Sequence, residues 1–242
     1  MPEIAPEFYV GYQPKAPPRL ARAMRVVVMA MLLGSVSVAA LLVAAQMPFV
    51  ASRFEFLQYK QYQGILFEWP YPLLVRGDQS YLLAGEGKHG AEQSVRGLDG
   101  TTVCLMGSLI ENGPDRMLEL RPGSLQPVGQ GGIRRDEVKL GAFTLTGEIV
   151  DTKCYFGVMN PGRGKVHRDC AARCISGGIP PGLLVRDAGG TARTILLAGS
   201  DGRRIGRELL DHVGEPVTIS GALMRIGTTL VLKAEPTDFR RE

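Results

Sequence analysis

The chain has 242 residues, enough for one large domain or two small ones beside a targeting segment. Its 31 glycines and 16 prolines indicate many turns, which favours short strands over long helices. The formal net charge of +4 is spread along the chain, so composition gives no reason to expect nucleic acid as a partner.

An apolar segment near the N-terminus is long enough to cross a membrane. No charged residue occurs in residues 26–52, and residues 26–45 would span a bilayer of ~30 Å as a helix. The preceding stretch carries more basic than acidic residues: Lys15, Arg19, Arg22 and Arg25 against Glu3 and Glu7. This bias predicts a cytoplasmic arm over residues 1–25, a transmembrane helix over residues 26–52, and a remainder outside the bacterial inner membrane, in the periplasm.

A cleaved signal peptide is the alternative for this segment. The basic region is longer than usual for a signal peptide, and the apolar run exceeds the roughly 7–15 residues of a signal core. We therefore expect a permanent, single-pass anchor.

The rest of the chain contains a pattern that occurs twice. Five pairs of segments follow one another in the same order: GILFEW (64–69) and GEIVDT (147–152), LLVR (73–76 and 183–186), YLLAG (81–85) and ILLAG (195–199), VCLMGSLI (103–110) and VTISGALM (217–224), MLEL (117–120) and LVLK (230–233). The first pair is 83 residues apart, the second 110 and the others close to 114. A repeated order of this kind indicates two copies of one supersecondary unit.

Each copy is predicted to form five short strands, because apolar residues alternate or cluster between Gly, Pro and Asp. In the second copy, apolar residues at helical spacing predict a helix over residues 205–213, between strands three and four. Five strands with a helix at that point are typical of an OB-type barrel. The predicted fold is therefore mainly β, with a transmembrane helix followed by tandem OB-like barrels at residues 58–128 and 143–236, and the boundary within residues 121–139.

The jump in offset from 83 to 110 indicates an insertion of ~27 residues in the second copy, at residues 152–180. It holds three of the four cysteines and one of the three histidines, namely Cys154, Cys170, Cys174 and His167. We expect it to be a loop elaboration outside the barrel core, where function is usually placed. The fourth cysteine, Cys104, lies in a predicted strand and is expected to be a small buried apolar residue.

Good helix formers predict a helix over residues 165–176, which would place His167, Cys170 and Cys174 on one face. A turn at Pro161 and Gly162 would bring Cys154 back towards that face. These four side chains would suit a soft metal ion or cluster, although their spacing fits no common zinc, iron–sulfur or haem pattern.

Two alternatives to the metal site remain open. One is a disulfide between Cys154 and either Cys170 or Cys174, which an oxidising compartment would favour. The other is a redox-active thiol. The cofactor expectation is accordingly a soft metal or none.

The second copy, over residues 143–235, resembles small exported bacterial OB-fold-like domains. The resemblance rests on GEIVDTKCY, then H-x-x-C-A-x-x-C, a Gly and Pro turn, and GLLV, here represented by Cys154, Tyr155, His167, Cys170, Ala171, Cys174, Gly178, Pro181 and Gly182. It implies export and an OB-like barrel. It implies no established activity, since these proteins form an uncharacterised group.

No nucleophile elbow, phosphate loop or paired-carboxylate motif occurs in the sequence. The leading hypothesis is therefore a non-catalytic, membrane-anchored subunit of an envelope complex, with a membrane oxidoreductase as the expected kind of complex. Its helix would contact other membrane subunits and its barrels would form a periplasmic platform. The alternative is a metal-binding or thiol-redox protein that acts through the insertion. Oligonucleotide binding is disfavoured by the compartment and by the few aromatic residues on strand faces.

Overall fold

The structure is a computed structural model that describes residues 16–46 and 52–242. Its first element is helix α1, Pro18–Gln46, and the stretch Pro18–Ala45 is long and apolar enough to cross a membrane. The helix begins at Pro18 rather than at residue 26, because proline suits a first helical turn and the residues after it are good helix formers. Arg19, Arg22 and Arg25 thus belong to the helix, whereas Glu3, Glu7 and Lys15 lie outside the described residues.

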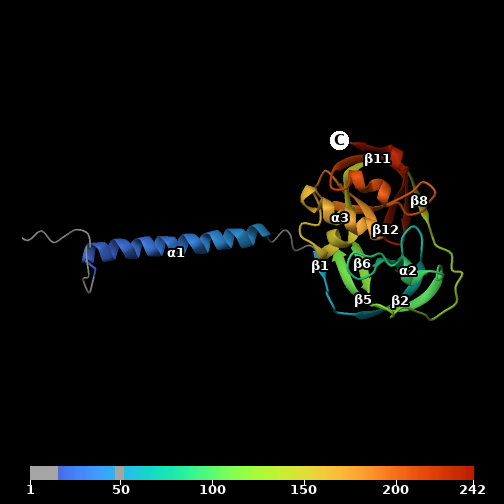
Figure 1. The fold of residues 1–242 in the computed structure, drawn as a ribbon, viewed down its shortest axis with the longest axis horizontal. Coiled ribbons are helices and arrows are strands. Elements are labelled where there is room, and N and C mark those ends of the chain that lie inside the picture. The colour runs from blue at the N-terminus through green and yellow to red at the C-terminus, as the bar shows by residue number, and fades with distance from the viewer. Residues whose placement is uncertain (1–15, 47–51) are drawn as a thin grey trace, which may run out of the picture. The chain divides into compact units, whose positions relative to one another are not determined.

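Residues 51–242 form a separate compact unit, which contains two closed five-stranded barrels (Figure 1). The first barrel consists of β2 (Lys60–Phe67), β3 (Leu73–Arg76), β4 (Gln79–Ala84), β5 (Thr101–Asn112) and β6 (Asp115–Leu120). The second consists of β8 (Val138–Asp151), β9 (Pro181–Arg186), β10 (Ala192–Ala198), β11 (Pro216–Ile226) and β12 (Thr229–Lys233). The predicted fold of an apolar helix and two five-stranded barrels is confirmed.

Both barrels close in the same way. Neighbouring strands are antiparallel, with one exception in each barrel. The third and fifth strands of each copy, β4 with β6 and β10 with β12, pair in parallel. A short helix follows the third strand in each copy, α2 (Glu92–Val95) in the first and η4 (Arg207–His212) in the second. The first helix was not expected, and the second is a 3₁₀-helix shorter than the predicted 205–213. Three short strands, β1 (Ser52–Phe54), β7 (Gln126–Pro127) and β13 (Phe239–Arg241), extend the sheets at β5 and β11.

Equivalent positions of the two copies fill the two barrel interiors. The buried pairs, each 114 residues apart, are Leu83 and Leu197, Val103 and Val217, Leu105 and Ile219, and Leu118 and Leu232. The strand registers correct one detail of the sequence alignment. Leu74 lies opposite Leu66 as Leu183 lies opposite Ile149, so the second strands are 109 residues apart and not 110.

Cys104 is half-exposed, so its predicted burial was wrong. Side chains alternate along β5, and Val103 and Leu105 already occupy the inward positions on either side of it. Cys104 therefore faces outwards, where the Gln61 side-chain amide donates to its sulfur at 2.9 Å.

A third apolar core joins the two barrels. It again uses equivalent positions, Leu82 and Leu196, Ala84 and Ala198, Ile110 and Met224, and Met117 and Val231, each 114 residues apart. Tyr71 reaches across this interface from the connection between β2 and β3. Its hydroxyl lies 2.8 Å from the carbonyl oxygen of Leu197 and 2.9 Å from that of Ile205. The barrels are thus packed against each other through the same face of each copy.

The insertion forms η2 (Cys154–Val158), η3 (Lys165–His167) and α3 (Arg168–Ser176). The expectation of a loop outside the barrel core was wrong, because Ala171 and Ile175 of α3 are buried in the core of the second barrel. Cys154, Phe156, Cys174 and Ile179 are buried in the core between the barrels. The insertion is therefore part of what holds the two copies together.

Candidate functional site

The site is a group of three cysteine sulfurs in the insertion. The Sγ atoms of Cys154, Cys170 and Cys174 all lie within 4.8 Å of one another, and those of Cys154 and Cys174 are 3.9 Å apart. Cys154 is 4% exposed, Cys174 is 1% exposed and Cys170 is half-exposed. The structure thus brings together three of the four side chains predicted from the sequence. All four cysteines of the chain are free thiols.

Two segments place these sulfurs. Cys170 and Cys174 are one turn apart on α3, so they share a face. Cys154 begins η2, where the backbone N–H of Cys154 donates to Asp151 Oδ1 at 2.8 Å. The chain then returns over Cys154 at Gly162, where a Cβ would lie 2.7 Å from the carbonyl oxygen of Cys154. A glycine is required at that close approach.

His167 has a different environment from the one predicted. The ring Nε2 of His167 lies 3.0 Å from Asp151 Oδ2, and both side chains are buried, at 4% and 0% exposure. Asp151, Cys154 and His167 form a second group whose ligand atoms lie within 4.8 Å of one another. His167 precedes α3 in a 3₁₀ turn, which changes its angular position relative to Cys170 and Cys174. The structure therefore groups His167 with Asp151 and Cys154 rather than with the two cysteines of α3.

The first barrel contributes a cation that sequence reasoning missed. The Lys88 ammonium lies 2.8 Å from Cys170 Sγ and 3.6 Å from Cys174 Sγ. Lys88 belongs to the loop that follows β4, which is far from the insertion in sequence. No local pattern marks it, because its role depends on how the two barrels pack.

This loop is tied to the insertion at further points. The buried Lys153 ammonium donates to the carbonyl oxygens of Gly85 and Gly87, at 2.7 Å each, and forms an ion pair with Glu119 of β6. The backbone N–H of Gly90 donates to the carbonyl oxygen of Gly177 at 2.9 Å. At Gly177 a Cβ would overlap with the carbonyl oxygen of Lys88. The position of Lys88 beside the sulfurs is therefore fixed by the fold.

The two buried cysteines have opposite pKa shifts. The hydrogen bond between them, together with the nearby Lys88 charge, lowers the pKa of Cys174 to about 7. The same hydrogen bond, burial and the Asp151 carboxylate raise the pKa of Cys154 well above its ordinary value. A hydrogen bond to Cys170 raises the pKa of Lys88, which stays an ammonium. At neutral pH Cys174 is thus partly ionised, and its thiolate form accepts a hydrogen bond from the Cys154 thiol.

The geometry permits two chemistries. Three convergent sulfur donors are a ligand set for a soft metal ion. Two sulfurs 3.9 Å apart would need to approach by nearly 2 Å to form a disulfide, whose bond is about 2.05 Å long. Comparison of the chain with protein-family models, curated proteins and solved structures finds no match. The resemblance to exported OB-fold-like domains stays a prediction.

Proposed function

We propose that the chain is a membrane-anchored protein that binds a soft metal ion through Cys154, Cys170 and Cys174. The observation that carries this proposal is the convergence of three sulfur atoms within 4.8 Å of one another, in a frame made of both barrels. A metal about 2.3 Å from each thiolate holds its sulfurs roughly 3.8 Å apart. The 3.9 Å between Cys154 and Cys174 Sγ already matches this spacing.

Charge favours a divalent ion. Three thiolates around a divalent ion leave one net negative charge, which would be costly to hold next to the inter-barrel core. The Lys88 ammonium, 2.8 Å from Cys170 Sγ, balances that charge. A divalent ion of the Zn²⁺ type is therefore the proposed ligand. The Asp151 carboxylate would orient Cys154 by accepting the backbone N–H of Cys154. Its other oxygen would hold the His167 ring beside the site.

The proposed location is the bacterial inner membrane, with the barrels in the periplasm. Supporting this are the apolar length of α1 and the three arginines in its first turns, since basic residues favour the cytoplasmic side. A cysteine introduced as Arg240→Cys should react with a membrane-impermeant maleimide only from the periplasmic side. Labelling only from the cytoplasmic side would reverse the orientation.

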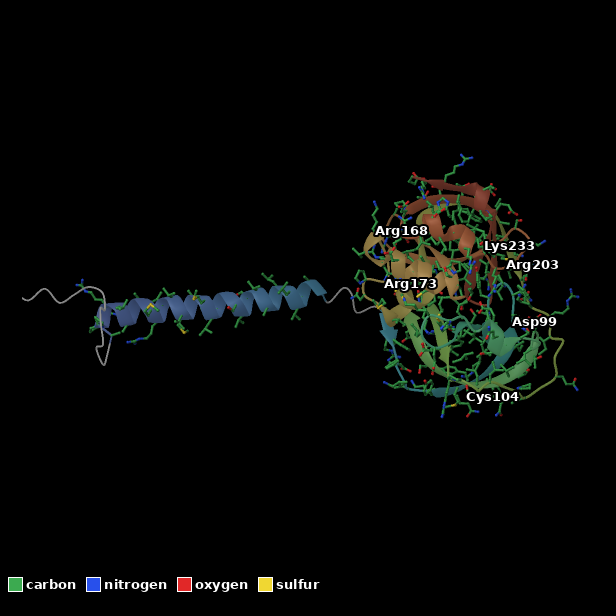
Figure 2. All side chains as sticks on the ribbon, in the orientation of Figure 1. Asp99, Cys104, Arg168, Arg173, Arg203 and Lys233 are labelled. Atoms are coloured by element: carbon green, nitrogen blue, oxygen red, sulfur yellow. The ribbon has the colours of Figure 1, made fainter. Side chains whose placement is uncertain are left out.

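The metal content of the purified full-length chain tests the site. Reduced protein in mild detergent, loaded with Zn²⁺ and dialysed, should retain about one ion per chain. Cys154→Ser, Cys170→Ser and Cys174→Ser should each lose it. Cys104→Ser is the matched control, because Figure 2 shows Cys104 on the first barrel, away from Arg168 and Arg173 of the insertion. Failure of the reduced protein to retain Zn²⁺, or equal loss in Cys104→Ser, would refute the proposal.

The second candidate is thiol–disulfide exchange, favoured by the lowered pKa of Cys174 and its contact with Cys154. In this reaction Cys154 and Cys174 together release two protons and two electrons and form one S–S bond. A disulfide of a partner protein takes up the electrons and protons and becomes two thiols. A loss of two mass units in the isolated protein, with no bound metal, would favour this candidate over the metal site.

The role of a non-catalytic subunit in an envelope complex, expected first from the sequence, is compatible with either candidate. Its partners would be other membrane subunits. Co-purification of stoichiometric partners from mild detergent is the measurement that would support it.

A further inference from the structure

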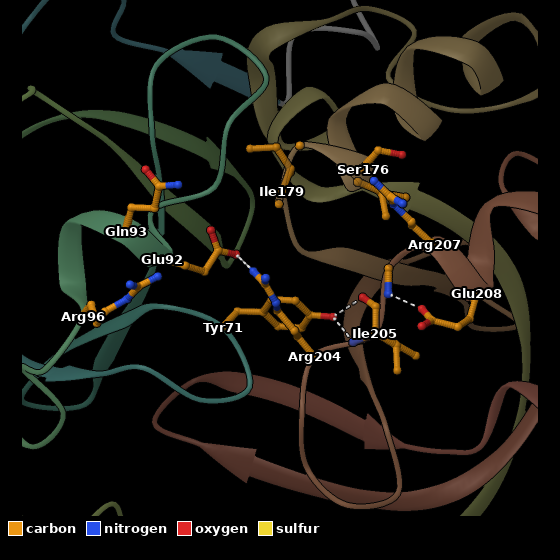
Figure 3. Close-up of a pocket in the computed structure, with 14 residues that line it drawn as sticks. Tyr71, Glu92, Gln93, Arg96, Ser176, Ile179, Arg204, Ile205, Arg207 and Glu208 are labelled. Atoms are coloured by element: carbon orange, nitrogen blue, oxygen red, sulfur yellow. Dashed lines mark hydrogen bonds and ion pairs between the residues drawn. The ribbon is translucent and has the colours of Figure 1, made fainter.

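A cavity of about 480 Å³ lies between the two barrels, with walls from both (Figure 3). Its volume falls within the range of small-molecule sites, which is roughly 300–1,000 Å³. The first barrel contributes Tyr71, residues of α2 and Arg96 directly after it, and the second contributes residues 204–208, which lead into η4. The turn after α3, residues 175–179, supplies another wall. The cavity is thus next to the sulfur site but does not include it.

Three arginines and two glutamates line this cavity, and not all of the arginines form ion pairs. Arg204 forms an ion pair with Glu92 at 2.8 Å. Glu208 accepts the backbone N–H of Gly206 at 3.0 Å, which lowers the pKa of this carboxyl and keeps it ionised. Within the described part of the chain, Arg96 and Arg207 have no hydrogen-bond or ion-pair partner. Figure 3 shows these two side chains on opposite sides of the cavity.

The wall that carries Arg207 is held by Tyr71, and Arg96 directly follows Val95, which is buried in the core of the first barrel. Tyr71 is 3% exposed, and its hydroxyl accepts the backbone N–H of Ile205 at 3.2 Å while it faces the carbonyl oxygens of Leu197 and Ile205. This fixes the segment from Arg204 to Glu208 against the first barrel. The contact between Gly90 and Gly177 fixes the wall after α3. The backbone of these walls is therefore fixed before a ligand binds, whereas the side chains of Arg96 and Arg207 are exposed.

We propose that this cavity binds a small polar anion bearing phosphate or carboxylate groups, held by Arg96 and Arg207. Guanidinium groups match the planar, bidentate geometry of carboxylate and phosphate, and they stay charged at any physiological pH. The paired Arg204 and Glu92 add no net charge, so the two remaining arginines outweigh the single carboxylate of Glu208. The ligand chemistry follows from this excess of positive charge in a polar cavity.

Calorimetric titration of the full-length chain in detergent tests the proposal, with inorganic phosphate and succinate as probes at ionic strength matched by sodium chloride. At least one probe should bind saturably. Arg96→Gln and Arg207→Gln should each weaken that binding about tenfold or more. Arg203→Gln is the matched control, because Arg203 is an exposed arginine of the same loop that does not line the cavity.

The two probes also separate the ligand classes. Binding of phosphate alone supports a phosphorylated ligand, and binding of succinate alone supports a carboxylate. No binding beyond the chloride control overturns the proposal, as does binding that Arg96→Gln and Arg207→Gln leave unchanged. Zn²⁺ retention, measured in the same variants, should stay at the level of the unmodified chain, so that failure here is distinguishable from failure of the metal site.

Discussion

The connection between the first and second barrel strands is short in one copy and long in the other. In the first barrel β2 ends at Phe67 and β3 begins at Leu73, and Tyr71 in this connection reaches into the second barrel. In the second barrel β8 ends at Asp151 and β9 begins only at Pro181, and this connection holds all three clustered sulfurs. The same scaffold thus carries a purely structural connection in one copy and the candidate chemistry in the other.

The first barrel has no insertion of its own, but its residues contact the insertion of the second barrel. The first barrel supplies Lys88 beside the sulfurs and Glu119 beside Lys153. The sulfur site is therefore a product of both barrels, although its cysteines come from one.

Breaking the buried ion pair between the barrels should have the largest effect. Lys153 and Glu119 side chains are 3% and 7% exposed, so removing one partner leaves an unpaired buried charge. We expect Glu119→Gln to lower the free energy of unfolding by about 3–5 kcal/mol in urea denaturation. The double variant Glu119→Leu with Lys153→Met should recover most of this loss. A cost below about 1 kcal/mol for the single variant would show that the first barrel does not depend on this tie.

A side chain at Gly177 should force the barrels apart. Its backbone conformation is open to any residue, but a Cβ would overlap with the carbonyl oxygen of Lys88. We expect Gly177→Ala to lower the free energy of unfolding by about 1–3 kcal/mol, as overpacking does. Gly206→Ala is the control, because its Cβ would meet no atom closer than 3.9 Å. Equal stability of the two variants would contradict the close approach.

The pKa of Cys174 should depend on both barrels. The thiolate is the charged form, so removing a hydrogen-bond donor or a nearby cation raises this pKa from about 7 towards its ordinary value. In the metal-free, reduced protein, Cys154→Ala should move the ultraviolet thiolate titration to higher pH. Lys88→Gln should move it by less, and Lys88→Arg should leave it nearly in place. An unchanged titration in Lys88→Gln would show that the first barrel has no electrostatic effect on the site.

The smallest effect is expected for the ion pair that ties the insertion to its own barrel. Arg168 and Glu215 lie 2.9 Å apart, but the Arg168 side chain is 37% exposed. Solvent screens such a pair, so Arg168→Gln should cost about 1 kcal/mol or less in urea denaturation. A cost equal to that of Glu119→Gln would contradict this ranking of the buried and the exposed ion pair.

The two barrels were predictable because their signal is local. Alternation of apolar residues and turn signals recurs at a nearly constant offset, and each barrel interior uses that alternation. The same alternation, applied to Val103 and Leu105, would have shown that Cys104 faces outwards. The convergence of Cys154, Cys170 and Cys174 was also predictable, because a helix and one return turn suffice to bring them together.

The contacts between the barrels were not predictable in this way. Lys88, Glu119 and Tyr71 contact residues of the other copy, and their roles depend on which faces of the two barrels meet. The position of His167 was also not predicted. The sequence predicted a helix that begins at Lys165, whereas α3 begins at Arg168, and the buried Asp151 carboxylate holds the His167 ring. Long-range packing thus decides the parts of the site that local patterns leave open.

The interface between the barrels has a consequence for the symmetry of the chain. Leu82 and Leu196, and likewise Ile110 and Met224, are equivalent positions that lie in one shared core. A surface that packs against its own counterpart is the arrangement of a homodimer with twofold symmetry. The chain thus reproduces within one polypeptide the packing of a self-complementary dimer, while its second copy alone carries the insertion.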